Sequence, residues 1–217
     1  MKHPWCWVYR NYIFLTIILI LVYLTGAFLA PIFQNSGFQS PADLLYRFYS
    51  STCHQFAFRS WFLYGKQPFY ALERAGIQNL DTYEQISGKS PTDLDAARQF
   101  TGNAEAGYKV ALCQRDVAIF SGLMLAALGF LIWKRKWQPI SVFMWIILGV
   151  LPIFLDGISQ LGGSSFPFFA FLPARESYPF MRTSTGLLFG VTTGLYLFPK
   201  MENLLKIIKI NHQCEDR

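Results

Sequence analysis

The chain has 217 residues, of which 53% are hydrophobic, 18% aromatic and only 15% charged. About 25% of the residues in a soluble domain are charged, so this composition excludes an ordinary soluble domain and indicates a membrane protein. The formal net charge of +6 is concentrated beside apolar segments, at 134–136 and at three lysines after residue 199. Basic residues in those places are typical of the cytoplasmic flanks of membrane helices, so we predict no nucleic-acid partner.

The first apolar segment carries no charge between Asn11 and Gln34 and is long enough to cross the hydrocarbon core of a bilayer, which needs about 20 residues. The apolar region of a signal peptide is shorter, about 7–15 residues, so we predict an uncleaved first span at about 12–33. The next segment, 41–64, repeats apolar residues along one helical face but includes Arg47 and Arg59. We therefore predict a helix that lies at the outer membrane surface without crossing it.

Residues 66–109 are more polar, and helix-start patterns at 81–84 and 90–93 predict a small extracytoplasmic helical insertion. Residues 158–181 are rich in Gly, Pro and Phe and are predicted to form a re-entrant or surface loop. The fold prediction is a single all-α integral membrane domain, 1–217, with four transmembrane helices. The last three predicted spans are at about 116–133, 139–155 and 183–198. The last span is rich in Gly and Thr, which favours close helix packing in lipid.

Four spans would place both termini on the same side of the membrane as the basic segment 134–136. That side holds nine Lys and Arg residues against three acids, whereas the other side holds ten of each. Because basic residues in short loops stay in the cytoplasm, we predict a multi-pass protein of the cell inner (plasma) membrane with both termini cytoplasmic. Nine polar residues would then meet at the outer face: Cys53, His54, Arg59, Cys113, Arg115, Asp116, Asp156, Glu176 and Arg182.

Several of these residues belong to short motifs. They are Cys53-His54-Gln55, Arg59-Ser60, Cys113-x-Arg115, Asp156-Gly157-x-x-Gln160, Glu176-Ser177 and Arg182-x-x-Thr185-Gly186. Together they resemble an uncharacterised family of bacterial integral membrane proteins, a domain of unknown function with the signature C-H-Q, C-A-R-C-x-G-I-Y, D-G-x-x-Q and R-x-x-T-G. The resemblance covers about 50–65 and 110–195 and implies a topology but no reaction. Asp116 stands where that family has its second cysteine, and 66–109 look like an insertion.

A metal site is one interpretation of the cysteines. Cys113 and Asp116 are three residues apart and share a helix face. With Cys53 and His54 they form a ligand set that suits zinc or another divalent metal. Neighbours on a regular helix point about 100° apart, so one ion could take both Cys53 and His54 only if the helix bends there. The alternative is a Cys53–Cys113 disulfide at the oxidising outer face, which leaves His54 and Asp116 as a hydrogen-bonded or ionic pair.

Two hypotheses for function follow, and the sequence leaves open whether the protein is an enzyme. The first is a metal-dependent enzyme acting on a lipid or other amphipathic substrate, with Asp156 as general base and Arg115 or Arg182 binding an anionic headgroup. A structural Asp156–Arg182 pair closing two helix ends is the simpler interpretation of those residues. The second hypothesis is a non-catalytic membrane subunit whose polar cluster is structural and whose insertion docks a partner.

Overall fold

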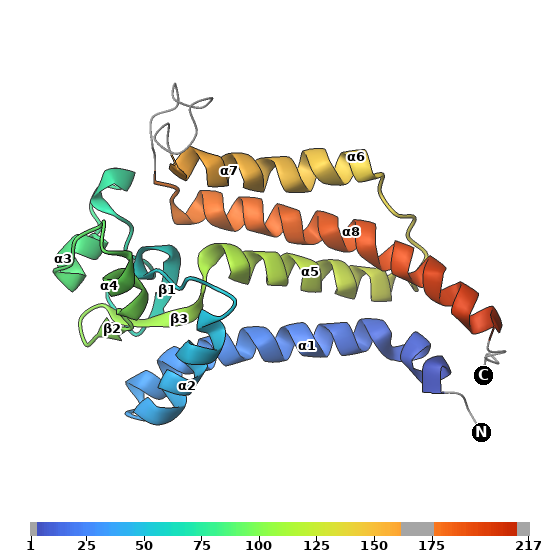
Figure 1. Cartoon of the computed structure of the whole chain (residues 1–217), viewed down its shortest axis with the longest axis horizontal. Helices are drawn as coiled ribbons and strands as arrows, with labels where there is room; N and C mark the ends of the chain where they lie inside the picture. Colours follow the sequence, from blue (N-terminus) through green and yellow to red (C-terminus); the bar gives the residue numbers. More distant parts are fainter. Residues whose placement is uncertain (1–3, 162–175, 212–217) are drawn as a thin grey trace.

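Four long helical rods form the body of the molecule. The computed structural model describes residues 4–161 and 176–211. The rods are α1 (Pro4–Asn35), α5 (Gln114–Ile132), a continuous rod of α6 (Val142–Trp145), the π-helix η3 (Ile146–Val150) and α7 (Leu151–Leu161), and α8 (Pro179–Asn211). Successive rods along the chain run in opposite directions. In space they lie in the order α1, α5, α8 and α6–α7, so the neighbours α5 and α8 run parallel (Figure 1). The predicted loop at 158–181 is therefore shorter at both ends, and its middle, 162–175, lies outside the described residues.

Three of the described helices are long and apolar enough to cross a bilayer: Cys6–Asn35, Gln114–Ile132 and Val142–Gln160. They expose many large apolar side chains, such as Leu19 on α1 and Phe154 on α7. Water would oppose so wide an apolar surface, whereas lipid accepts it. The predicted helical membrane protein is therefore confirmed in its class. Helix α8 is less apolar because Gly and Thr replace aliphatic residues along it.

Those small residues set how closely α8 approaches α5. A Cβ atom built on Gly186 would lie 2.7 Å from the carbonyl oxygen of Arg115, and one on Gly190 would collide with the carbonyl oxygen of Ile119. Glycine at these positions lets the two helix backbones touch, as is common between helices in lipid. The contact at Gly186 also sets the start of α8 directly beside Arg115, at the end of the bundle where the polar residues gather.

Residues 36–113 form a cap on that end of the bundle (Figure 1). In chain order the cap contains α2 (Gln39–Ser50), η1 (Ala57–Arg59), β1 (Ser60–Leu63), η2 (Glu73–Ala75), α3 (Tyr83–Ser87), α4 (Leu94–Gln99), β2 (Gly102–Asn103) and β3 (Gly107–Cys113). The strands pair antiparallel in the order β1-β3-β2. The prediction of an all-α protein is therefore wrong for the cap. Strand β3 was missed because it lies at the junction between the predicted insertion, 66–109, and the predicted span, 116–133, and continues without a break into α5.

The helix predicted at 41–64 is also shorter than expected. Helix α2 ends at Ser50, and the chain then passes through an irregular segment into η1 and β1. The backbone at Gln55 has φ +55°, a left-handed conformation that no continuous helix allows. Aromatic residues in β1 favour a strand over a helix. In the predicted insertion, α4 starts after Asp93, at the end of the helix-start pattern 90–93, and α3 has a full capping box between Thr82 and Gln85.

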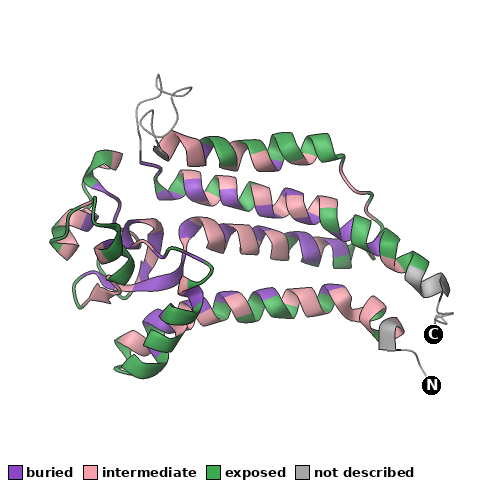
Figure 2. Ribbon diagram, in the orientation of Figure 1, coloured by how far each residue is buried: buried purple, intermediate pink, exposed green. Residues whose placement is uncertain are grey.

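The core connects the cap to the bundle. One buried cluster joins α1, α2 and β3 through residues such as Leu24, Tyr46 and Leu112. Buried residues extend along β3 and the facing sides of α5 and α8, whereas exposed residues cover α2 and the outer surface of the bundle (Figure 2). Burying apolar area across this junction at about 25 cal/mol per Å² holds the cap rigidly on the bundle end.

Candidate functional site

A cavity of about 220 Å³ lies where the cap meets the bundle. It is lined by Thr52, Cys53, His54, Gln55, Phe56, Arg59, Cys113, Arg115, Asp116, Gln160 and Arg182. These residues come from the segment after α2, from η1, from the start of α5, and from the facing ends of α7 and α8. The cavity therefore brings together all four predicted metal ligands and both predicted arginines. Asp156 does not line it.

The segment that carries Cys53 is held by its neighbour Gln55. The buried Gln55 side chain donates through Nε2 to the backbone carbonyl oxygen of Tyr46 at 3.0 Å. The backbone carbonyl oxygen of Gln55 accepts from Lys109 Nζ at 2.8 Å. These two bonds fix the left-handed backbone at Gln55, a conformation that costs a non-glycine residue about 1 kcal/mol or more. The reversed backbone directs the Gln55 N–H to Cys53 Sγ at 3.5 Å.

Cys113 starts α5 as its N-cap residue. Its Sγ accepts the Asp116 N–H at 3.4 Å, and its own N–H donates to Cys53 Sγ at 3.3 Å. Both cysteines are free thiols in the structure. Cys53 Sγ thus accepts two backbone N–H groups, from Gln55 and from Cys113, close to the start of α5.

Three potential ligand atoms meet here. One ligand atom each of Cys53, Cys113 and Asp116 lies within 4.8 Å of the other two. A hydrogen bond with Cys53, followed by burial, raises the pKa of the Cys113 thiol well above its usual value. His54 is not in this group, because the chain has left the helix and its exposed ring stacks on Phe56, with the ring centroids 5.5 Å apart.

Arg115 lines the cavity and contacts Asp156 behind it. Its guanidinium forms an ion pair with the Asp156 carboxylate, whose side chain is only 2% exposed. Gln160, which also lines the cavity, donates to the Asp156 carboxylate at 3.3 Å. Asp156 therefore reaches the cavity through Arg115 and Gln160 and fixes the position of both.

A second buried carboxylate, Glu176, forms ion pairs with three arginines. Arg182 and Arg59 (at 3.4 Å) reach one carboxylate oxygen, and Arg74 reaches the other at 2.8 Å. Arg182 also donates to the carbonyl oxygen of Phe58 at 3.2 Å, which ties α8 to η1. The simple Asp156–Arg182 pair considered from the sequence does not form. Asp156 pairs instead with Arg115 on α5, and Arg182 pairs with Glu176 just before α8.

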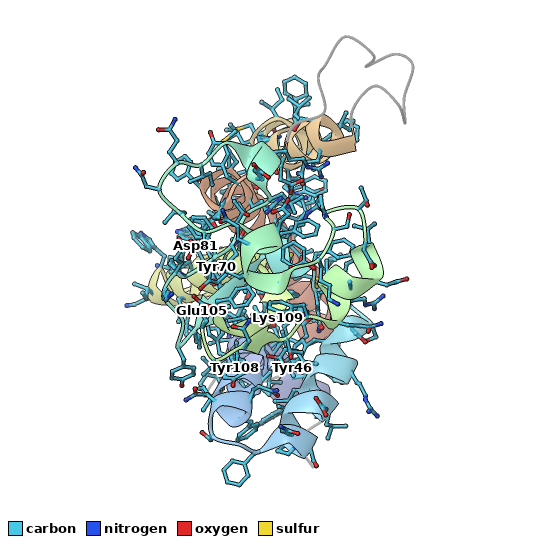
Figure 3. The ribbon with its side chains drawn as sticks, turned by 90° about the vertical axis from the view of Figure 1, so that its left-hand side faces the viewer. Tyr46, Tyr70, Asp81, Glu105, Tyr108 and Lys109 are labelled. Carbon is cyan, nitrogen blue, oxygen red and sulfur yellow. The ribbon has the colours of Figure 1, made fainter. Side chains whose placement is uncertain are left out.

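Lys109 was missed by sequence reasoning. It is fully buried on β3, and its ammonium donates to the carbonyl oxygens of Gln55 and Arg98. Tyr46 lies beside it (Figure 3) and donates through its hydroxyl to the Lys109 carbonyl oxygen at 2.6 Å. Burial lowers the pKa of Lys109 to about 7. A single lysine inside the apolar run 108–113 was the one signal in the sequence that could have pointed to it.

Comparisons with known proteins agree with the membrane class. A curated relative, an uncharacterized protein of the archaeon Methanocaldococcus jannaschii, is 24% identical over 196 residues, which cover 88% of this chain and 92% of the relative. Because that relative is archaeal, the expected bacterial origin stays a prediction. No solved structure matches the chain. Residues 98–196, which include β3, α5 and most of α8, match the model of a family described as "Predicted membrane protein (DUF2085)", and this protein, with its three apolar helices, is accordingly a membrane protein similar to that family.

Proposed function

We propose that Cys53, Cys113 and Asp116 bind a divalent metal ion, zinc before others, and that the protein is a metal-dependent enzyme acting on an amphipathic substrate at the outer membrane face. The observation that carries the proposal is the meeting of three ligand atoms within 4.8 Å in the wall of a cavity that arginines also line. Ligands of this kind rarely gather at a membrane surface without a partner that offsets their charge.

The donor set fits zinc. Two thiolate sulfurs and one carboxylate oxygen are ordinary zinc ligands, and sulfurs that share a tetrahedral zinc lie about 3.8 Å apart. The ligand atoms of the cluster lie within 4.8 Å of one another, so they exceed that spacing by at most about 1 Å. Three protein ligands with a fourth position toward a cavity are typical of catalytic zinc, whereas structural zinc has four protein ligands. His54 lines the same cavity, and a rotation away from Phe56 would be needed for it to become the fourth ligand.

The remaining residues suit binding and proton transfer. A bound divalent ion would supply an activated water at neutral pH. Arg115 and Arg182 would attract an anionic part of the substrate, and Asp156 would hold Arg115 in place through their ion pair. Asp156 was the general base expected from the sequence. Its place behind Arg115 favours a positioning role, and the exposed His54 at the cavity is the better placed group for exchanging protons with water.

The proposal includes a membrane arrangement. Helix α8 would be the fourth span, because its 33 residues extend about 50 Å and it lies between two helices that are apolar enough to cross. The start of α1 and the end of α8 lie at the bundle end opposite the cap (Figure 1), so both termini would be cytoplasmic in the inner membrane. Leu44 and Phe48, both exposed on α2, would rest in the outer lipid surface.

Cobalt substitution tests the ligand set. Purified protein loaded with Co²⁺ should show a thiolate-to-metal charge-transfer absorption that falls by about half in Cys53→Ser and in Cys113→Ser, because two sulfurs contribute to it. Asp116→Asn should weaken Co²⁺ binding and leave the sulfur absorption per bound ion unchanged. Ser50→Ala, close to the site but outside it, is the control. Absence of a thiolate band in the wild type would overturn the proposal.

A second candidate is a non-catalytic membrane subunit whose cysteine pair is structural. The observation that favours it is the direct contact between the Cys113 N–H and Cys53 Sγ at 3.3 Å, which leaves the two sulfurs near enough to join on oxidation after a modest movement. In that case the cap would dock a partner. Peptide mapping of protein purified without reductant separates the two cases, since only the second gives a peptide pair linked through Cys53 and Cys113.

A further inference from the structure

The cavity wall has an excess of positive charge. Arg59, Arg115 and Arg182 line it, against the single carboxylate of Asp116. The two carboxylates that pair with these arginines, Asp156 and Glu176, do not line the cavity and lie behind them. These carboxylates fix the guanidinium groups in position, and with Arg74 the whole group holds four arginines against three carboxylates, a formal surplus of one positive charge.

Two arginine donors in this wall lack an acceptor. The Nε atoms of Arg59 and Arg115 are buried and have no hydrogen-bond partner among the described residues. Arg59 Nε approaches Glu176 at 3.4 Å without the geometry of a hydrogen bond. These Nε atoms are closed off from solvent, so an anion in the cavity would meet other nitrogens of the guanidinium groups, and the feature that indicates a ligand is the convergence of three arginines on one cavity.

We propose that this arginine wall binds a phosphate group. This inference rests on the proposed function, because it assigns the phosphate as the anionic part of the substrate beside the cysteine cluster. A tetrahedral oxyanion with two charges can accept from several guanidinium groups that arrive from different directions, here from η1, α5 and α8. A carboxylate has only two oxygens in one plane, and the protein already supplies that chemistry through Asp156 and Glu176.

The size of the cavity limits what enters it. A volume of about 220 Å³ holds a phosphate group and a small substituent, and it is below the range of about 300–1,000 Å³ that is usual for drug-sized ligands. Any acyl chains would have to remain outside, in the lipid around the bundle. Both a phospholipid with a terminal phosphate and a small soluble phosphate ester present this chemistry, so the experiment has an arm for each.

The test is ligand-induced stabilisation of the metal-loaded, detergent-purified full chain. Inorganic phosphate should raise the midpoint of thermal unfolding in a saturable way, and chloride at matched ionic strength should not. Arg59→Met and Arg115→Met should each weaken the apparent affinity for phosphate at least tenfold. Arg115→Lys, which keeps the charge without the guanidinium fork, should weaken it less. Arg74→Met is the matched control, because Arg74 also pairs with Glu176 but does not line the cavity, and its affinity should stay within about twofold.

Two further measurements are needed. One distinguishes a phospholipid from a soluble phosphate ester, and the other distinguishes the phosphate proposal from the metal proposal. Short-chain phosphatidic acid that binds tighter than glycerol 3-phosphate would identify a lipid, and the reverse order a soluble ester. Phosphate stabilisation should persist in Cys113→Ser, because the arginines do not depend on the metal. If Cys113→Ser and the wild type bind phosphate equally and neither holds metal, the metal proposal fails and the arginine site stands. Equal weakening by Arg74→Met and Arg115→Met, or no saturable effect of phosphate, would overturn the inference.

Discussion

The two ends of the helix bundle each bury a glutamate, and they treat it differently. At the end opposite the cap, Glu202 accepts hydrogen bonds from Tyr9 at 3.0 Å and Tyr12 at 2.9 Å and lies 3.7 Å from Arg135. Arg135 in turn donates to the carbonyl oxygens of Tyr9 and Arg10 and stacks on the Tyr12 ring. One cation and two neutral hydroxyls satisfy one carboxylate. The cluster joins α1 and α8 to the segment that follows α5.

At the cap end, Glu176 faces three arginines, which is more charge than one carboxylate can neutralise. Among the described residues, the Nε atoms of Arg59 and Arg115 have no hydrogen-bond partner, and both arginines line a cavity. The comparison shows that a buried ion pair alone does not mark a functional site. We propose that surplus charge and arginines around a cavity distinguish an end that binds a ligand from an end that closes the bundle.

The largest expected effect comes from neutralising the two glutamates in turn. Glu176→Gln leaves buried arginines without their counter-charge and should destabilise the protein by about 3–5 kcal/mol. Glu202→Gln keeps an oxygen for the tyrosine hydroxyls and should cost only about 1–2 kcal/mol. Unfolding of both variants in mixed detergent micelles measures the difference. Equal losses would show that the two ends are energetically alike.

Lys109 extends the comparison, because it is a buried cation with no carboxylate partner among the described residues. Burial lowers its pKa from 10.5 to about 7, so between those values the unfolded chain binds a proton that the folded chain lacks. Stability should therefore rise with pH across about 7 to 10.5, by up to about 1.4 kcal/mol per pH unit. Thermal unfolding across that window should show a shallower rise in Lys109→Met than in the wild type. The exposed Lys89→Met is the control and should keep the wild-type slope.

A smaller effect is expected at Gln55, where the backbone is left-handed. Glycine adopts that conformation freely and alanine does not, so Gln55→Gly should be more stable than Gln55→Ala by about 1 kcal/mol, although both lose the bond to Tyr46. Ser51, with a right-handed helical φ of −76°, is the control, and there alanine should be at least as stable as glycine. The same order at both positions would mean that the backbone at Gln55 is not strained.

Much of the architecture could be predicted from the sequence because charge-free apolar runs have few other uses. The runs at 12–33 and 116–133 lie within α1 and, to within one residue, α5. The sheet could not be predicted, because β3 passes straight into α5 and its pairing with β1 depends on contacts distant in sequence. The gathering of Cys53, Cys113 and Asp116 was expected from topology, and the separation of His54 was not, because it depends on the turn at Gln55.

Which arginine pairs with which carboxylate could not be predicted from the sequence either, because it depends on how the helices pack. Asp156 and Arg182 end and begin neighbouring helices, which made them natural partners. The glycine contacts instead bring the backbone of α5 at Arg115 against α8. Arg115 there forms the ion pair with Asp156. Which arginine pairs with which carboxylate therefore follows from how closely two helices pack, a quantity that residue types indicate but do not determine.

The central claim is that the cysteine cluster binds metal, and a single preparation tests it most directly. Protein purified without chelator or reductant is divided between elemental analysis and alkylation of Cys53 and Cys113 read by peptide mass spectrometry. The account predicts about one zinc or similar ion per chain, lost in Cys113→Ser, with both thiols protected until a chelator is added. Protein that holds no metal, and in which Cys53 and Cys113 react only after reduction, would contradict it.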